Sequence, residues 1–242
     1  MGEEPLSIRV QGKPYAVIMR TPGDEIAHAA GFCLSEGIVD RADDFANLAF
    51  CDEASGSVVT VTLKHSRSRQ AAQCLDRHGY ISQTSCGICG KEVISDLMVA
   101  IPPLNDHVVL DISKAVPLLE SLYTLQPLRE STKSSHVAAL FNTDYELLSL
   151  AEDVGRHNAL DKAIGKLFLT GKLNEAVFMV LSSRLSYELV QKAGRAKIPV
   201  ILSKSRPTNL SVSLASELNL TVACQSRESG LFIFCGKTRL KG

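Results

Sequence analysis

Strand-like and helix-like segments alternate regularly through roughly the last hundred residues, and this alternation limits the fold more than any other feature of the chain. Short runs with the length of a strand alternate with segments that have helical apolar spacing, and the last two runs follow each other directly. Such an alternation predicts α/β layering around a substantially parallel sheet. The predicted strands are residues 145–153, 175–183, 198–204, 220–226 and 231–236, and the predicted helices are residues 156–171, 186–197 and 208–219.

The N-terminal part of the chain has a different pattern. Residues 6–11 and 14–20 are β-favouring runs around a glycine and predict a hairpin. The following stretch, "TPGDEIAHAAGFCLSEG", predicts a helix with Asp24 at its N-cap and Gly37 at its end. Residues 57–64 then alternate between apolar and polar side chains like a strand.

From residue 64 to residue 90 the apolar periodicity disappears, so we expect a long loop there. Connections of this length inside a compact domain are usually either functional or disordered. It carries Lys64, Arg67, Arg69 and Arg77 against one acid, Asp76. A weaker boundary falls in the polar, proline-containing region around 103–133. We therefore predict an N-terminal β-rich subdomain over 1–105 and an α/β core over 106–242.

Charge and hydropathy exclude several classes of protein. Lys and Arg together number 26, as do Asp and Glu, so no overall positive field attracts nucleic acid or an anionic membrane. The longest apolar runs, such as "AVFMVL", have the length of a strand and are too short to span a bilayer. The chain opens with "MGEEPLSIRV", which is acidic where a signal peptide is basic. We expect a cytoplasmic protein.

Seven cysteines, an odd number, argue against a disulfide framework in a chain without a secretion signal. Cys33, Cys51 and Cys224 fall in apolar segments, where free cysteine usually packs in the core. Cys86 and Cys89 lie instead in the glycine- and serine-rich stretch "SQTSCGICGK". These two require a chemical explanation.

Three explanations compete for this CxxC pair. Structural zinc needs a second pair of ligands, and the chain has no second CxxC. A thioredoxin-like redox pair should follow a strand, whereas an expected loop precedes this one. A nucleophilic or carrier thiol fits better, because Lys91 and the start of a predicted helix behind the motif favour the thiolate. Gly87 and Gly90 leave room for a partner to approach.

A second polar constellation occupies the predicted strand-to-helix junction in "LAEDVGRHNALDKAIG". In open α/β sheets, ligands bind in the crevice beyond the strand ends. Helix capping and a solvated helix face would account for some of these side chains, but six polar groups exceed what capping needs. They are Glu152, Asp153, Arg156, His157, Asn158 and Asp161.

Two further candidates carry weaker signals. His136, in "STKSSHVAAL", is expected at the start of a helix, where a single histidine is more often structural than catalytic. The loop "CQSRESG", residues 224–230, follows a strand and is rich in small hydrogen-bond donors with one arginine. Such a loop suits a phosphate or a guanine.

Taken together, these segments resemble the formate dehydrogenase accessory sulfurtransferase family (FdhD). The matching stretches are "EEPLSIRVQG", "VIMRTPGDEIAHAAGFCLSEGIV", "TSCGICGK", "EDVGRHNALDKAIG" and "SSRLSYELVQKAGRAKIPVILSKSRPTNLSVSLASELNLTV", in this order and over nearly the whole chain. The resemblance implies a layered cytidine-deaminase-like core. It also implies a homodimer that receives sulfur from a cysteine desulfurase as a cysteine persulfide. The sulfur then passes to molybdenum bis(molybdopterin guanine dinucleotide), the cofactor that a formate dehydrogenase receives.

The resemblance also implies site residues. The persulfide falls on Cys86. From the chemistry of the pair itself, we expect Cys89 to assist as a second thiol. The cofactor-binding loop falls on Gln225, Ser226, Arg227, Glu228, Ser229 and Gly230. This chain departs from the family where a Gly-Gly pair is usual, at Lys133 and Ser134, and where Gly-Phe is common, at Cys224 and Gln225. Phe232 and Phe234 stand where Asn and Tyr are frequent.

Two alternatives to a sulfurtransferase come from other functional classes. One is a non-catalytic chaperone that binds the molybdenum cofactor and uses its cysteines only to dock a partner. The other, weaker alternative is a zinc-dependent deaminase-like hydrolase, which needs His-x-Glu and Pro-Cys-x-x-Cys. Here Ala138 stands where the glutamate belongs after His136, and "SSRLS" stands where thiolates are needed. We expect no catalytic zinc.

Overall fold

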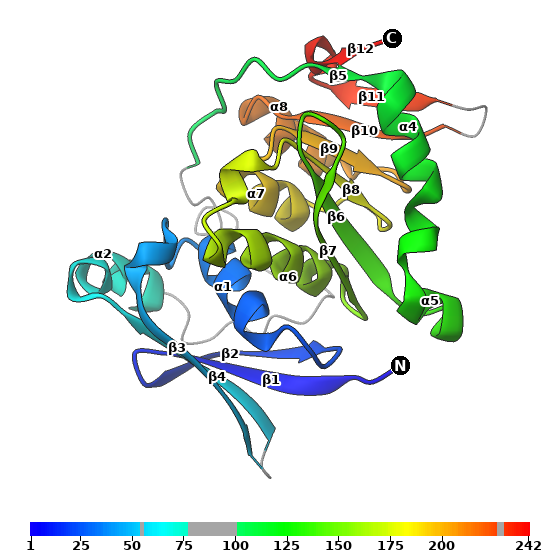
Figure 1. The fold of residues 1–242 in the computed structure, drawn as a ribbon. Coiled ribbons are helices and arrows are strands. Elements are labelled where there is room, and N and C mark those ends of the chain that lie inside the picture. Colours follow the sequence, from blue (N-terminus) through cyan, green and yellow to red (C-terminus); the bar gives the residue numbers. More distant parts are fainter. Residues whose placement is uncertain (54–55, 77–100, 227–229) are drawn as a thin grey trace.

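The computed structural model describes residues 1–53, 56–76, 101–226 and 230–242, and it has a mixed α/β fold (Figure 1). The strands are β1 (Glu4–Val10), β2 (Lys13–Arg20), β3 (Phe45–Glu53), β4 (Gly56–Leu63), β5 (Leu110–Asp111), β6 (His136–Phe141), β7 (Leu147–Asp153), β8 (Phe178–Leu181), β9 (Val200–Ser203), β10 (Thr221–Gln225), β11 (Leu231–Cys235) and β12 (Leu240–Lys241). The α-helices are α1 (Glu25–Ser35), α2 (His65–Asp76), α4 (Ile112–Glu120), α5 (Pro127–Thr132), α6 (Arg156–Leu169), α7 (Tyr187–Arg195) and α8 (Asn209–Glu217). The 3₁₀ helices are η1 (Ala42–Asp44), η2 (Ser121–Leu125), η3 (Leu173–Glu175) and η4 (Lys237–Arg239).

A six-stranded sheet forms the larger layer, in the order β11-β10-β9-β8-β6-β7. Its central strands β8, β9 and β10 are parallel, whereas β6, β7 and β11 run antiparallel to their neighbours. The predicted alternation of strands and helices is confirmed, because each parallel strand is linked to the next by one helix, α7 or α8. A parallel connection needs such a crossover.

Side chains of the central strands alternate between two cores, one on each face of the sheet. Met179 and Ile201 belong to the core under α6, α7 and α8. Val180 and Leu202, the next residues along each strand, belong to the core that also contains Leu119 of α4. Both faces are therefore covered, and this explains why the strands read as continuous apolar runs.

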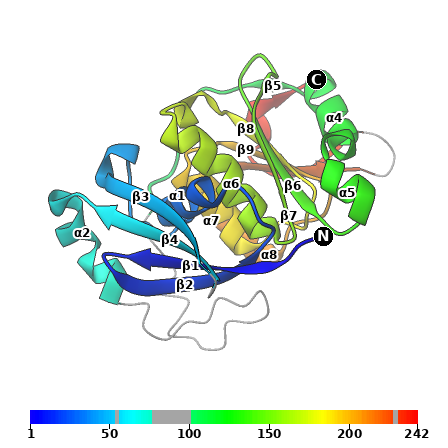
Figure 2. The same ribbon diagram turned by 60° about the horizontal axis from the view of Figure 1, so that its bottom comes forward.

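The N-terminal sheet has the order β2-β1-β4-β3 and contains the predicted hairpin of β1 and β2. One face of this sheet packs on α1, and Leu6, Ile8, Val59 and Val61 are fully buried there. Helix α1 lies between this sheet and α6 (Figures 1 and 2). The core around α1 continues without interruption into the core under α6, α7 and α8.

Two glycines bring the backbones of α1 and α6 into direct contact. A Cβ added at Gly31 would lie 1.9 Å from the carbonyl oxygen of Asp161. A Cβ added at Gly165 would lie 1.8 Å from the carbonyl oxygen of Ala27. Neither position can hold a side chain unless the helices separate, so glycine at both positions sets the distance between the two halves of the chain.

The polar segment from residue 64 differs from expectation. Its first part is a helix, α2, rather than a loop. Helix α2 lacks an apolar period because it lies at the surface, and one of its arginines is structural. Arg67 donates to the carbonyls of Gly37 and Ile38, each at 2.7 Å, beyond the end of α1, and it pairs with Asp40. The rest of the expected loop, from residue 77 onwards, lies outside the described residues.

Three smaller expectations also need correction. Asp24 precedes α1 as predicted, but its side chain makes no capping hydrogen bond and pairs with Lys166 of α6 at 2.8 Å. Cys33 and Cys224 are buried as expected, whereas Cys51 is exposed because β3 is an edge strand of the N-terminal sheet. Helices α4 and α5 occupy the region that sequence patterns described only as a polar boundary.

Within the described residues, no helix is both long and apolar enough to cross a membrane.

Candidate functional site

The candidate site lies where the parallel strands end. Leu181 of β8 is in register with Ser203 of β9, which is in register with Cys224 of β10. Because β6 is antiparallel to β8, and β7 to β6, the first residue of β6 and the last residue of β7 meet at the same edge. We call this edge, with the loops and helix starts that follow it, the carboxyl edge. Ligands of open α/β sheets bind at such edges.

His136 lies at the carboxyl edge, but it begins strand β6 rather than a helix. Its Nδ1 is 3.5 Å from the hydroxyl oxygen of Ser182, which accepts a hydrogen bond from the Val137 backbone N–H at 2.9 Å. Burial, and then the positive charge of Arg156, lower the pKa of His136 below its usual value. The imidazole is therefore neutral at pH 7 and able to accept or donate a hydrogen bond.

His157 lies in the first turn of α6 at the same edge. Its Nε2 is 2.8 Å from a carboxylate oxygen of Glu188 and 3.2 Å from the hydroxyl of Ser186, both on α7 or its N-cap. A serine–histidine–acid relay would need the two different ring nitrogens. Since both contacts use one nitrogen, this arrangement is not a hydrolase triad. The hydrogen bond from His157 also lowers the pKa of Glu188.

The acidic side chains of the carboxyl edge are already engaged in holding the fold. Glu152 accepts hydrogen bonds from the backbone N–H groups of Leu128 at 2.8 Å and Arg129 at 3.1 Å, which fixes the start of α5. Asp153 is fully buried and pairs with Lys162 at 2.7 Å. Glu188 pairs with His157, as described above.

Several cations of the carboxyl edge, in contrast, form no close ion pair among the described residues, although Arg156 lies near enough to Glu188 to lower the pKa of that carboxyl. The Nε of Arg156 is buried without a hydrogen-bond partner in that part of the chain. Arg184 and Arg206 are exposed in the loops after β8 and β9. These two loops run side by side, since Leu185 and Pro207 form a parallel bridge. The edge is therefore locally positive in a chain of zero net charge, as an anion-binding site requires.

The predicted cofactor-binding loop joins β10 to β11 beside these cations. Gln225 is the last residue of β10, and the Ser226 N–H donates to the Gly230 carbonyl at 3.0 Å. Gly230 has a φ of 90°, which only glycine adopts readily. The guanidinium carbon of Arg206 lies 5.2 Å from the ring centroid of Phe232, at the base of the loop. Arg227, Glu228 and Ser229 lie outside the described residues, as do Cys86 and Cys89.

Asp161 does not belong to the carboxyl edge. It is buried between helices, where it pairs with Lys192 of α7 and accepts a hydrogen bond from Ser35 of α1. Asn158 is also structural, since its amide donates to the Met19 carbonyl at 2.8 Å and to Asp153 at 2.9 Å. The predicted six-residue constellation therefore divides into four residues that hold the fold and two, Arg156 and His157, that face the candidate site.

Sequence patterns missed the buried charges around α1. Arg20 is 1% exposed, and it donates to Ser57 at 2.9 Å and pairs with Glu25 at 3.2 Å. His28 is fully buried, and neither of its ring nitrogens has a partner in good hydrogen-bond geometry within the described residues. A charged residue at a position where the helical period expects an apolar one, such as Lys192 in α7, is the sequence signal that could have indicated a buried charge. Its partner cannot be read from local spacing.

Metal-ligating side chains do not cluster within the described residues. In the ranges 1–53, 56–76, 101–226 and 230–242, no three His, Cys, Asp or Glu side chains are placed to hold one ion. Burial raises the pKa of the Cys33 and Cys224 thiols, so these two cysteines are poor nucleophiles.

Known proteins similar to this chain belong to one family. The family model described as FdhD/NarQ matches residues 1–241. A sulfur carrier protein FdhD of Streptomyces avermitilis is 35% identical over 99% of this chain and 88% of its own length. The protein of the same name from Mycolicibacterium paratuberculosis is 35% identical over 98% of this chain and 90% of its own length.

A solved structure agrees in fold. A crystal structure of a candidate formate dehydrogenase accessory protein from Desulfotalea psychrophila superimposes with a TM-score of 0.76 and 24% sequence identity. The match covers 99% of this chain and 90% of the other. Because the family model and the relatives match the chain from end to end, this protein is a member of the FdhD/NarQ family.

Proposed function

We propose that this chain is a sulfurtransferase that supplies sulfur for the maturation of a formate dehydrogenase. The observation that carries the proposal is the match, over 98–99% of the chain, to relatives named sulfur carrier protein FdhD. The CxxC pair supplies the only two neighbouring thiols of the sequence. The sulfur donor is a cysteine desulfurase, and the acceptor is molybdenum bis(molybdopterin guanine dinucleotide), bound as a substrate.

Sulfur loading needs no outside oxidant or reductant. The Cys86 thiolate attacks the terminal sulfur of the donor's persulfide, and a new S–S bond forms on Cys86. The donor's S–S bond breaks at the same time, and its electron pair leaves on the donor cysteine as a thiolate. Cys89 can then attack the Cys86 sulfur, which gives a Cys86–Cys89 disulfide and releases the carried sulfur as hydrosulfide. The two thiols supply the two electrons of this second step.

The carboxyl edge supports the cofactor part of the proposal. The cofactor carries two pyrophosphate groups, and this edge presents Arg156, Arg184 and Arg206, none of which forms a close ion pair among the described residues. Arginine donors bind phosphate oxygens in pairs. The described ends of the loop, Gln225, Ser226 and Gly230, adjoin the same edge. We further propose the cytidine-deaminase-like layering and the homodimer that the family resemblance implies, and the cytoplasmic location that charge and hydropathy suggest.

Mass spectrometry tests the proposal directly. The protein is incubated with a cysteine desulfurase and cysteine, and the peptide containing Cys86 is expected to gain one sulfur atom. Cys86→Ala should abolish the gain, and Cys89→Ala should weaken sulfur delivery. Cys51→Ala, which changes an exposed cysteine outside the motif, is the matched control.

Two outcomes would contradict parts of the proposal. If Cys86→Ala still gains sulfur while Cys89→Ala does not, the two cysteines have exchanged roles. If the double variant still matures the dehydrogenase, the protein acts as a cofactor-binding chaperone and not as a sulfur carrier.

A further inference from the structure

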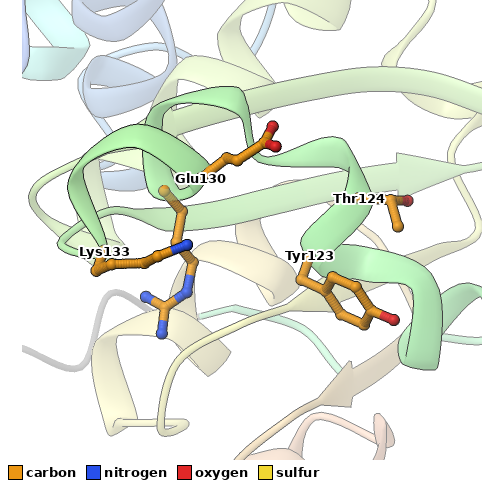
Figure 3. A pocket seen from close by; sticks show the side chains of 5 residues that line it. Tyr123, Thr124, Glu130 and Lys133 are labelled. Atoms are coloured by element: carbon orange, nitrogen blue, oxygen red, sulfur yellow. The ribbon is translucent and has the colours of Figure 1, made fainter.

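An open pocket lies between η2 and α5. Its volume is about 370 Å³, and it is lined by Tyr123, Thr124, Arg129, Glu130 and Lys133. Figure 3 shows Glu130 and Lys133 on the α5 side and Tyr123 and Thr124 on the other side. We call it the α5 pocket.

The α5 pocket borders the carboxyl edge. The Lys204 ammonium, in the loop after β9, donates to the carbonyl of Glu120 at 3.2 Å, immediately before η2. The guanidinium of Arg129 donates to the carbonyl of Ser135 at 3.0 Å, next to His136. Helices α4 and α5 accordingly stand on the side of the molecule where the parallel strands end (Figure 1). A ligand at the carboxyl edge can therefore extend into the α5 pocket.

Lys133 is strained where it enters this pocket. It follows the last residue of α5 with a φ of 57°, in the left-handed region that is unfavourable for every residue except glycine. With this backbone conformation, the exposed side chain of Lys133 lines the pocket.

The charges around the pocket favour an anion. Arg129 and Lys133 line it, and the Lys204 nitrogen lies 5.8 Å from the centroid of the Tyr123 ring. Among the described residues Lys133 has no ion-pair partner, and the hydrogen bond to Ser135 uses only one of the Arg129 donors. Two cations, Arg129 and Lys133, line the pocket against the single carboxylate of Glu130, and Lys204 lies beside it with Glu120. The excess of positive charge among the lining residues provides a place for a phosphate group.

Tyr123 and Glu130 define what else the ligand carries. The Tyr123 side chain is 65% exposed, so its ring offers a free face on which a planar heterocycle can stack. The carboxylate of Glu130 has two acceptor oxygens and no donor. It is complementary to a ring edge that presents an N–H beside an amino group, as guanine and pterin both do.

We propose that the α5 pocket binds a phosphorylated 2-amino-4-oxo heterocycle, with the phosphate on Arg129 and Lys133. The ring stacks on Tyr123, and its amino edge donates to Glu130. This inference rests on the proposed function, because the proposed substrate contains both guanine and pterin rings with phosphate groups. It assigns one end of that substrate to residues outside the loop at 225–230.

Calorimetric titration with GDP tests the pocket through a matched pair of variants, Lys133→Gly and Lys197→Gly. Lys197 is also exposed, also follows a helix and also has a φ of 57°, but it lies beyond α7. Both substitutions remove one charge and relieve the same backbone strain. We expect Lys133→Gly to bind GDP about tenfold more weakly, as for the loss of one charge-assisted hydrogen bond. Lys197→Gly should keep wild-type affinity.

Thermal unfolding of the same variants separates binding from folding. Because glycine relieves the strain at either position, neither variant should melt below the wild type. A weaker affinity in a protein of unchanged or higher melting temperature would locate the effect in the pocket.

The choice of ligand distinguishes the two possible sources of the ring. Wild-type protein should bind GDP more tightly than inosine diphosphate, which lacks the amino group, and Glu130→Gln should remove this preference. Dihydroneopterin triphosphate supplies the pterin ring in place of guanine. If Lys133→Gly weakens the binding of dihydroneopterin triphosphate more than the binding of GDP, the pocket binds the pterin end of the cofactor. If it weakens the binding of GDP more, the pocket binds the guanine end.

Two results would overturn the inference. If Lys133→Gly binds both ligands as the wild type does, the pocket is not the site, although sulfur loading of Cys86 would still support the proposed function. If the wild type binds neither ligand, the pocket and the cofactor part of the proposed function fail together.

Discussion

The ammonium nitrogen of Lys192 lies 2.8 Å from both carboxylate oxygens of Asp161, in an interior place where their side chains are only 9% and 2% exposed. The pair joins α7 to α6, and the Ser35 hydroxyl extends it to α1 at 2.9 Å. Burial alone would lower the pKa of Lys192, but the Asp161 carboxylate raises it above its usual value. Three helices therefore meet at one buried charge pair.

Breaking this pair should be costly. Lys192→Met leaves the Asp161 carboxylate buried without its cation, and we expect the free energy of unfolding to fall by about 3–5 kcal/mol. Urea denaturation measures the change. Lys166→Met is the matched control, because Lys166 pairs with Asp24 at the same 2.8 Å but in a half-exposed place, where the expected cost is below about 1 kcal/mol. Equal losses in the two variants would contradict a role for burial.

The stability of the protein should depend on pH through His28. Burial, and then the positive charges of Lys162, Lys192 and Arg20, hold the pKa of His28 well below its usual 6.5, with a smaller opposing effect from Asn158. Below pH 6.5 the unfolded chain takes up a proton that the folded protein refuses. Stability is therefore full above this pH and falls by about 1.4 kcal/mol per pH unit as the pH drops towards the folded pKa.

Denaturation curves between about pH 7.5 and pH 5 measure this slope. In His28→Gln the slope should decrease by the contribution of one proton, whatever the variant's absolute stability. A His28→Gln protein with an unchanged slope would show that His28 does not resist protonation in the fold.

The contact between α1 and α6 should tolerate no added side chain. Gly31→Ala places a Cβ 1.9 Å from a backbone oxygen of α6, so the helices must separate, and we expect a loss of 3 kcal/mol or more, roughly the upper end of overpacking costs. Gly194→Ala in α7 is the comparison. Its Cβ meets the end of the flexible Leu218 side chain at 2.8 Å, which can move away. If chemical denaturation gives similar losses for both, the helices are not held at contact distance.

Arg227 is expected to bind a phosphate of the cofactor, as the loop composition and the family resemblance suggest. Arg227→Ala should weaken GDP binding in calorimetry by the worth of one charged hydrogen bond, about 1.5–3 kcal/mol. Arg41→Ala serves as the control, since Arg41 is exposed and pairs only with nearby Asp43 at 3.7 Å among the described residues. If Arg227→Ala binds GDP with unchanged affinity, Arg227 does not bind the phosphate.

Sequence patterns predicted those helices and strands in which apolar residues recur with a regular spacing along the chain. The segments after residue 145 were identified because strands covered on both faces and helices covered on one face have distinct periods. Helix α2 was missed because it is polar and surface-bound. The run "HVAALF" that begins at His136 is almost continuously apolar, and such a run fits a buried strand as well as a helix, so the expected helix start is a strand in the structure.

Sequence patterns predicted the candidate site only in part. Arg156, His157 and the start of the loop at 225 do meet at one edge, because parallel strands end together. The roles of Asp153, Asn158 and Asp161 depend on partners far away in the chain. Asp153 accepts a hydrogen bond from the Thr21 backbone, for example, and no local spacing encodes such a pairing.

The glycine contact between α1 and α6 also affects the order in which the protein can be completed during synthesis. Gly31 leaves the ribosome about 130 residues before Gly165. At bacterial rates of elongation, this interval lasts on the order of ten seconds. Throughout that time the apolar face of α1, which α6 finally covers, has no permanent cover. The nascent N-terminal half therefore depends on transient protection until a helix from the far end of the gene has been translated.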